Sequence, residues 1–384
     1  MSQASDVGRV AASPKRRLSL FDSTSIIVGI IIGSSIYESS PMIASRMGGP
    51  LALVGVWVLG AVLSLIGALC YAELATAYPA DGGDYVYLTR AFGRPVGFMF
   101  AWAQLWIVRP GSVGAMAYVF ARYANELWPL GTGAGALIVY AGGAVVVLTV
   151  INMLGLRPGK WTQNVLTTVK FVGLCAIVVA GFFASSSSGG TATAVPATSV
   201  NLSLAMIFIL YAYGGWNEMA YVAAEVRDPG RNILRSLVLG MVAVTGVYVL
   251  LNLAFVNAFG FEGLCGVTVG LVIGFGRKAD GFGSLVNFTT PVFWIFFLLV
   301  GVSLVVLRVR EPGTPRPYRV PLYPVIPALF CLSSLFMLHA SFDWAWKNRS
   351  LEALWSLVIL GVGLGLSFCD TGRGEGRNGI GCKA

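Results

Sequence analysis

The sequence predicts an all-α integral membrane protein, and three observations lead to that prediction. The chain has 384 residues, of which 56% are hydrophobic and only 11% are charged, which is too apolar for a soluble domain of this size. Apolar stretches of about twenty residues recur along it, and this is the length that a helix needs to cross a bilayer. Two of these stretches are interrupted at their centres by small residues, so the first and sixth membrane helices are expected to be discontinuous.

The chain begins with a basic leader, residues 1–22, which we expect to lie in the cytoplasm and to precede the first span. It leads into a full-length apolar stretch rather than a short cleavable one, so no signal peptide is expected. Ten full spans follow, at 24–43, 51–76, 96–120, 133–153, 164–184, 203–225, 235–258, 284–307, 322–340 and 352–368. A further apolar stretch, 264–275, is too short to cross the membrane as a helix and is expected to lie at the interface or to re-enter.

Basic residues predict the orientation of these spans. With the N-terminus inside, the inner segments hold 18 of the 26 Lys and Arg residues and the outer segments hold 6. The positive-inside rule therefore predicts a cytoplasmic N-terminus. The same inner loops account for the net charge of +9, so contact with anionic lipid explains it and no nucleic-acid partner is expected.

The chain offers little for covalent chemistry. Its six cysteines show no paired spacing and fall mostly in spans, and His339 is its only histidine. Buried cysteines of this kind behave as small hydrophobic residues. We therefore expect no metal site, no cofactor, no catalytic residue and no enzymatic activity.

The first interruption lies in the first span and consists of Ile32, Gly33, Ser34, Ser35 and Ile36. Unwound backbone here would offer free polar groups, and the positive end of the following half-helix would face an anion such as a carboxylate. Packing of neighbouring helices against small residues is the alternative, and the sequence leaves it open.

The second interruption lies in the sixth span and combines glycines with aromatic residues. It consists of Tyr211, Tyr213, Gly214, Gly215, Trp216 and Asn217. Unwound carbonyls could receive an ammonium group while an aromatic ring covers an apolar side chain, so the two interruptions together suit an α-amino acid. Whether Trp216 binds a ligand or only packs in the core stays open.

Two cations fall within spans. Lys170 lies in the fifth span, where a buried charge is a functional candidate. It could replace a coupling sodium ion or exchange a proton, or its side chain could extend to the inner membrane surface. Arg109, near the middle of the third span, needs a carboxylate or backbone carbonyls. Its candidate partners are Glu38, Glu73 and Glu218.

Several segments resemble the amino acid–polyamine–organocation superfamily, and L-type amino acid transporters with their bacterial relatives are the most similar branch. These segments are residues 29–36, 71–74, 79–87, 107–110, 211–217, 225–232 and 316–321. The resemblance implies an inverted-repeat transporter fold in a domain spanning 23–369. Its parts are a first repeat at about 23–184, a second at about 203–307, two further helices at about 322–368 and a disordered tail at 370–384.

The resemblance also implies functions for residues. The two interruptions bind the amino acid, with Tyr211 at the position of an aromatic gate. Lys170 matches a lysine that stands near a sodium position in sodium-independent members. Transport is expected to proceed by alternating access, as sodium-independent uptake or exchange of L-amino acids, in the plasma membrane (the inner membrane of a bacterium).

Two departures from the family pattern matter. Residues 123–137 contain no cysteine, so a disulfide-linked heavy chain is not expected. After Gly260 the family's eighth helix is missing and the ninth is reduced to 264–275, so the second repeat is expected to be incomplete. The alternative to a transporter is therefore a truncated paralogue that does not transport, either an amino acid sensor or an inactive remnant.

Overall fold

The computed structural model describes residues 18–33, 35–80, 82–131, 133–154, 156–183, 201–274, 281–347 and 351–375. Apart from one isolated parallel bridge between Leu18 and Val226, the regular structure of these residues is helical. The predicted all-α class is confirmed. Residues 1–17 of the leader and residues 376–384 of the tail lie outside the described part of the chain.

The helices follow the predicted spans closely. The first half contains α1 (Leu20–Ile31), α2 (Ser35–Ala44), α3 (Pro50–Ala77), α4 (Asp84–Phe92), α5 (Arg94–Ala103), the π-helix η1 (Gln104–Val108), α6 (Arg109–Leu127), α7 (Ala134–Met153) and α8 (Leu156–Phe183). The second half contains α9 (Leu202–Ala212), the 3-10 turn η2 (Trp216–Glu218), α10 (Met219–Val222), the 3-10 turn η3 (Ala223–Glu225), α11 (Pro229–Gly274), α12 (Gly281–Arg310), α13 (Val325–Lys347) and α14 (Leu351–Glu375).

Each of the ten expected spans coincides with one of these helices or with a broken run of them. Among the described residues, six helices are long and apolar enough to cross a membrane, or seven if the bent pair α1 and α2 counts as one span. The full number of crossings therefore stays a prediction, because the runs α5–η1–α6 and α9–α10 are divided and α14 has only a short apolar stretch.

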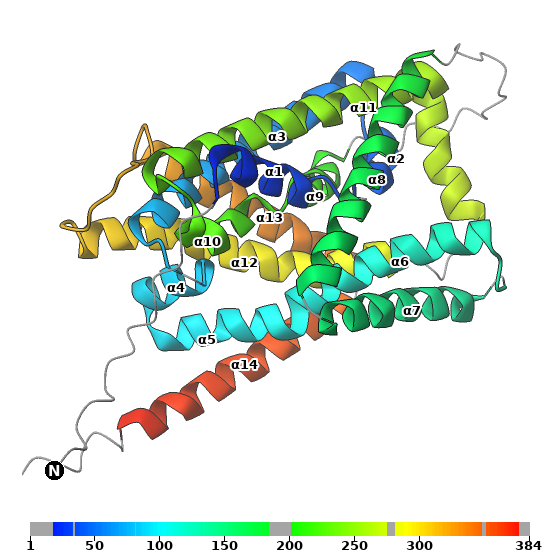
Figure 1. Ribbon diagram of the computed structural model, residues 1–384. Helices are drawn as coiled ribbons and strands as arrows, with labels where there is room; N and C mark the ends of the chain where they lie inside the picture. The colour runs from blue at the N-terminus through cyan, green and yellow to red at the C-terminus, as the bar shows by residue number, and fades with distance from the viewer. Residues whose placement is uncertain are drawn as a thin grey trace, which may run out of the picture.

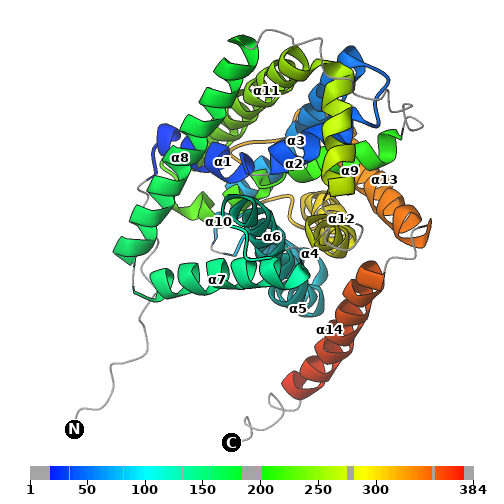
Figure 2. The same ribbon diagram turned by 90° about the vertical axis from the view of Figure 1, so that its right-hand side faces the viewer.

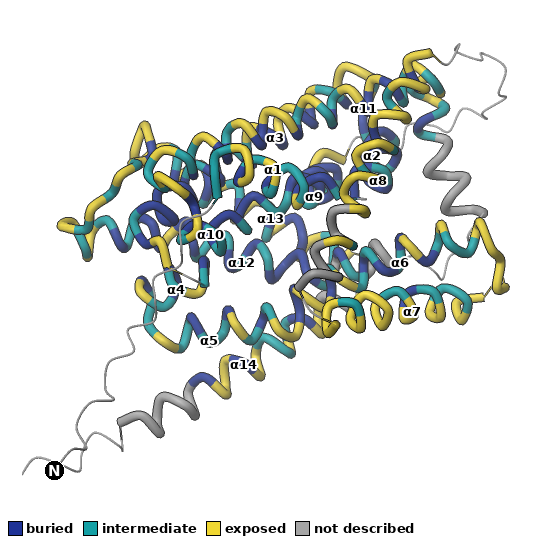
Figure 3. The backbone as a smooth tube through the Cα atoms, in the orientation of Figure 1, coloured by how far each residue is buried: buried dark blue, intermediate teal, exposed yellow. Residues whose placement is uncertain are grey.

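The interrupted helices lie inside the bundle and intact helices surround them. In Figure 1, α1 and α9 lie between α3 and α11 on one side and α12 and α13 on the other, and Figure 2 shows α7, α8 and α14 at the periphery. α3 packs along α11, and α12 packs along α13. The burial pattern agrees, since the central helices are dark in Figure 3 whereas α7 is mostly exposed.

The peripheral helices expose apolar side chains. In α7 only Ala141 is buried, although the helix is almost entirely apolar, and residues such as Val139 and Val146 are 62% exposed. An exposed apolar surface of this extent marks contact with a membrane or a partner. Because α7 has the length of a membrane span, lipid is the natural neighbour of this surface.

The region of the expected missing helix contains one short helical segment. α11 is continuous in sequence to Gly274 but is kinked at Gly260, whose backbone is non-helical (φ 71°, ψ 165°), and its end turns away in Figure 1. The part after the kink, 261–274, spans about 21 Å at 1.5 Å per residue, less than the roughly 30 Å of a bilayer core. At the other end of the chain, α14 continues to Glu375, past the predicted domain boundary at 369, because backbone hydrogen bonds can extend a helix beyond its apolar part.

Candidate functional site

The first interruption is a true break between two helices. α1 ends at Ile31, and Ile32 adopts an extended conformation (φ −71°, ψ 93°). α2 begins at Ser35, and the two helices are inclined by 54°. The last carbonyls of α1 consequently have no partners within the helix. Lys170 Nζ donates hydrogen bonds to two carbonyl oxygens there, those of Gly29 (2.9 Å) and Ile32.

The second interruption is also unwound. α9 ends at Ala212, and Gly214 N donates to Tyr211 O at 3.0 Å in a tight turn. Gly215 then has φ +112°, a left-handed conformation that side chains with a Cβ disfavour. The chain continues into η2, so the regular helix is replaced by turns between Tyr213 and Met219.

The two breaks touch one another. The Tyr248 hydroxyl, on α11, lies 2.9 Å from the carbonyl oxygens of both Ile31 and Ala212 and can donate to either. A Cβ atom on Gly215 would lie 2.7 Å from Ile30 Cγ2, so the glycine permits close approach of the two backbones. Residues nearly two hundred positions apart therefore form one site.

A cavity of about 380 Å³ lies at this junction. The first break and its helix contribute Ile30, Ile31, Gly33 and Ser35, and the second contributes Tyr211, Gly214, Gly215, Asn217 and Glu218. The opposite wall comes from α6 and α12, through Arg109, Ser112, Met116, Thr290, Phe293, Trp294 and Phe297. The cavity thus combines free backbone groups, one charged pair and an apolar aromatic wall.

Six of the predicted substrate-binding residues line this cavity: Gly33, Ser35, Tyr211, Gly214, Gly215 and Asn217. Ser34 lies outside the described residues. Ile32 instead lines a second cavity of about 390 Å³ beside Lys170, and Ile36 is fully buried.

Tyr213 and Trp216 lie behind the cavity in aromatic clusters. Tyr213 packs against Trp57 and Tyr248, with ring centroids 5.9 and 5.2 Å away. Trp216 stacks on Phe297 at 5.5 Å and meets the edge of Tyr71 at 5.0 Å. These contacts favour the packing interpretation of Trp216, and they place its ring directly behind a wall residue of the cavity.

Arg109 pairs with one of its three candidate partners. Its guanidinium lies 3.1 Å from the Glu218 carboxylate, and the two side chains remain 55% and 28% exposed. The other candidates have partners elsewhere: Glu38 binds Arg122 at 2.9 Å, and Glu73 belongs to the network described below. The π-helix η1 immediately precedes Arg109, and such a bulge is frequent at functional sites.

Sequence reasoning missed Tyr248 and the α12 wall. Tyr248 lies in a long, mainly apolar helix, where nothing sets its hydroxyl apart from the other polar side chains, such as Thr245 and Asn252. Phe293, Trp294 and Phe297 read as ordinary apolar span residues, because nothing in their spacing separates a cavity wall from a lipid-facing surface.

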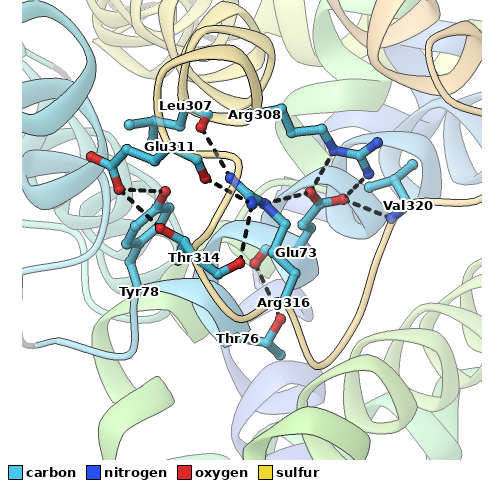
Figure 4. A network of polar contacts seen from close by, with 9 residues as sticks. All are labelled: Glu73, Thr76, Tyr78, Leu307, Arg308, Glu311, Thr314, Arg316 and Val320. Carbon is cyan, nitrogen blue, oxygen red and sulfur yellow. Dashed lines mark hydrogen bonds and ion pairs between the residues drawn. The ribbon is translucent and has the colours of Figure 1, made fainter.

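A buried ionic network lies at one end of the bundle (Figure 4). The Glu73 carboxylate accepts hydrogen bonds from Arg308 (Nε at 2.7 Å) and from Val320 N at 2.7 Å, and it lies 3.4 Å from Arg316 Nε. A charged group that is 99% buried requires this degree of pairing. The network attaches α3 to the end of α12 and to the proline-rich segment that leads to α13.

The exposed edge of the same region holds a second carboxylate. Glu311 accepts hydrogen bonds from Arg90 Nε at 2.8 Å and from the Tyr78 hydroxyl at 3.1 Å, as the left side of Figure 4 shows for Tyr78. The Arg90 hydrogen bond lowers the pKa of Glu311 below its usual value. Glu311 is therefore held as a carboxylate.

The chain before α1 also contacts the segment that follows the second break. Leu18 N donates to Glu225 O at 3.0 Å, and Arg227 N donates to Leu18 O at 2.9 Å. These two hydrogen bonds form the isolated bridge and join the chain before α1 to the segment that precedes α11. No group of three His, Cys, Asp or Glu residues that could hold a metal ion occurs in the described part of the chain.

The chain is similar to proteins of one family. The model of the amino acid permease family matches residues 18–264. The b(0,+)-type amino acid transporter 1 of Mus musculus is 29% identical, over 85% of this chain and 83% of its own length. The serine/threonine exchanger SteT of Bacillus subtilis is 25% identical, over 92% of this chain and 97% of its own length. The cystine/glutamate transporter of Homo sapiens is 27% identical, over 87% of this chain and 82% of its own length.

The predicted resemblance is thereby confirmed, together with the multi-pass membrane class and the expectation of a transporter rather than an enzyme. The chain belongs to the amino acid permease family of the amino acid–polyamine–organocation superfamily, whose members are membrane transporters.

Proposed function

We propose that the chain moves L-α-amino acids across the plasma membrane by alternating access, as sodium-independent uptake or exchange. One observation carries the proposal: the two helix breaks touch and line the same cavity. Relatives named as an amino acid transporter, a serine/threonine exchanger and a cystine/glutamate transporter support the substrate class. The inner membrane of a bacterium, with the N-terminus in the cytoplasm, suits the SteT similarity and the distribution of basic residues.

The chemistry of the cavity matches the two charges of an α-amino acid. The backbone N–H groups at the start of α2, next to Gly33 and Ser35, face a carboxylate favourably because the helix dipole is positive there. The carbonyls at the end of α9 suit an ammonium group. Met116, Phe293 and Trp294 leave an apolar wall for the substrate side chain.

Lys170 is proposed to serve as a fixed cation at the first break. Its ammonium donates to two carbonyls of α1, and a transported sodium ion would bind to oxygens of the same kind. Replacing Lys170 with Ala should therefore alter uptake and its ion or pH dependence while the protein still folds. Unchanged uptake with an unchanged pH profile would mean that the Lys170 side chain only extends toward the inner membrane surface.

We propose that the protein works without a disulfide-linked heavy chain, because the outer loop 123–137 contains no cysteine. The amino acid substrate and the lipid bilayer are then its required partners. The chain also needs no cofactor for this function.

The test uses the purified full chain and a matched pair of variants. A saturable rise in unfolding temperature with particular L-amino acids identifies ligands, because a ligand that binds only the folded state stabilises it. Counterflow exchange of those ligands in proteoliposomes then tests transport. Gly214→Leu should abolish both signals, because a Cβ there would already lie 3.0 Å from Tyr211 O. Gly55→Leu, on an exposed helix position with no atom within 4 Å of the added Cβ, should retain both.

A binding protein that does not transport is the second candidate. The short segment 261–274 after the kink at Gly260 favours it, because one wall of the second repeat lacks a full-length helix. A saturable thermal shift without any exchange in proteoliposomes would establish this alternative. Exchange by the wild-type chain would exclude it.

A further inference from the structure

A buried carboxyl group lies near the second break but does not line the cavity described above. Asp84 begins α4 and is 2% exposed. Its Oδ1 atom has no hydrogen-bond partner, and neither does the buried hydroxyl of Tyr87, whereas the Tyr71 hydroxyl interacts with the Asp84 carboxyl group as a hydrogen-bond donor. A buried polar group without a partner costs free energy, so two such groups beside one buried carboxyl call for an explanation.

The cluster is formed by several elements. Tyr71 comes from α3, Tyr87 from α4 itself, and the two rings meet edge to face at 6.4 Å. Tyr221, from α10, covers the cluster at Gly83, where a Cβ would lie 3.2 Å from the Tyr221 ring. Gly83 has a positive φ of +49°, which glycine adopts readily, and the chain turns there so that Asp84 lies against these rings.

Among the described residues, charged groups act on Asp84 from the cavity side only. Glu218 on η2 and Arg109 on α6 act on Asp84 from the cavity side. α5 and α12 also pack on α4 and contribute Arg94, Arg308 and Arg310, but these belong to the other end of α4: Arg310 donates to Ala91 O at 2.8 Å, and Arg308 binds Glu73. Arg90, on α4, binds Glu311.

None of these basic residues therefore forms an ion pair with the Asp84 carboxyl group. Burial raises the pKa of Asp84 to about 8, and the Glu218 carboxylate acts in the same direction; the Tyr71 hydroxyl and Arg109 oppose the shift. The N-terminus of α4 also favours the ionised form. Because burial outweighs these groups, Asp84 carries a proton near neutral pH. A protonated carboxyl can donate a hydrogen bond, and the hydroxyl oxygens of Tyr71 and Tyr87 beside it can accept one.

An electrostatic interaction and a ring contact connect this cluster to the substrate cavity. Glu218 and Arg109 line the cavity and influence Asp84 electrostatically. The Tyr71 ring meets the edge of Trp216 in the second break at 5.0 Å. A movement of the second break that opens the site toward α4 would separate Trp216 from Tyr71 and change the distance of Glu218 and Arg109 from Asp84. It would also admit water to Asp84.

We propose that Asp84 is a proton-binding site coupled to the substrate cavity: it is protonated in the conformation described and releases its proton to water when the second break and Tyr71 separate. The step breaks the O–H bond of the carboxyl group, leaves a carboxylate and transfers the proton to water, with no oxidation or reduction. The coupling to substrate rests on the proposed transport function, whereas the proton site itself is a property of the folded chain.

Infrared spectroscopy tests the site without requiring transport. The purified wild-type chain in lipid should show the carbonyl stretch of a protonated carboxylic acid at pH 7, and this band should titrate with a midpoint near pH 8. Asp84→Asn, which keeps the size and removes the charge, should lose the band. Asp343→Asn is the matched control, because Asp343 is 45% exposed and pairs with Lys347, and it should keep the band. A wild-type spectrum without the band, or a band that persists in Asp84→Asn, would overturn the proposal.

Proteoliposome uptake tests the coupling, with L-serine and L-leucine as probes. A pH gradient, acid on the side of entry, should stimulate net uptake by the wild type and by Asp343→Asn. Asp84→Asn should lose this stimulation while it retains counterflow exchange. Equal stimulation of Asp84→Asn and wild type would overturn the coupling. Failure of wild-type exchange with every L-amino acid, in protein that shows the band, would instead refute the transport function and leave the proton site standing.

Discussion

The buried network around Glu73 makes a quantitative prediction about stability. Glu73→Gln keeps the shape of the side chain but removes its negative charge. The Gln amide oxygen can still accept hydrogen bonds at one of the two carboxylate positions, but the NH2 group at the other position is a donor and cannot accept one from Arg308. The neutral side chain can no longer balance Arg308 and Arg316, which come from the end of α12 and the segment after it.

The burial of these groups sets the expected magnitude. The Glu73 side chain is 1% exposed, and those of Arg316 and Arg308 are 6% and 17% exposed. Removing one partner of a buried ion pair costs about 3–5 kcal/mol. The exposed pair Arg90–Glu311, with side chains 50% and 26% exposed, should contribute less than about 1 kcal/mol. Glu73→Gln should thus cost at least about 2 kcal/mol more than Glu311→Gln, or roughly a thirtyfold larger change in the folding equilibrium.

The assay is unfolding of the purified chain by denaturant, at low and high salt. Glu311→Gln should resemble the wild type, and the small difference should vanish at high salt because exposed charges are screened. Glu73→Gln should unfold at much lower denaturant under both conditions. Equal stability of the two variants, or a Glu73→Gln deficit that disappears with salt, would refute the view that burial makes this network strong.

Three further predictions concern packing, the contact between the breaks, and pH. Gly67→Ala should weaken L-amino acid binding in thermal-shift titrations, because its Cβ would lie 2.6 Å from the Trp216 ring; the open position Gly55→Ala should not, and equal affinities would contradict this role. Tyr248→Phe should lower stability by about 1–3 kcal/mol and reduce ligand affinity, since it removes the hydroxyl that bridges the breaks; denaturant unfolding and ligand titration measure the two effects, and wild-type values for both would count against it. The pKa of Glu311 is lowered, chiefly by Arg90, so its contribution to stability is present above its ordinary pKa of 4.5 and is lost as pH falls through the lowered folded value; the pH dependence of unfolding should therefore flatten in Glu311→Gln, and an unchanged slope would argue against the pair.

Local residue chemistry was sufficient to locate the breaks, and the resemblance of several segments to a known superfamily predicted the family. Gly33, Gly214 and Gly215 interrupt apolar runs, and a small residue at bilayer depth can be recognised without knowing its neighbours. The same holds for the ten helical segments, since an apolar run of twenty residues satisfies its own backbone hydrogen bonds. Lys170 was recognisable as well, because a cation within an apolar run is costly wherever the helix lies.

Tertiary structure alone decided which residues meet. Arg109 had three candidate carboxylates, and only the folded chain brings Glu218 within 3.1 Å of it. Tyr248 joins the two breaks from a helix whose sequence gives no hint of that contact, and Asp84 is buried because α3, α4 and α10 converge on it. Hydrophobic patterning depends on a residue's own helix, whereas pairing, burial and the pKa of a carboxyl group depend on atoms that are distant in sequence. This difference explains why the sequence by itself determined the kind of protein and the position of its breaks, while the partners of its buried charges emerged only in three dimensions.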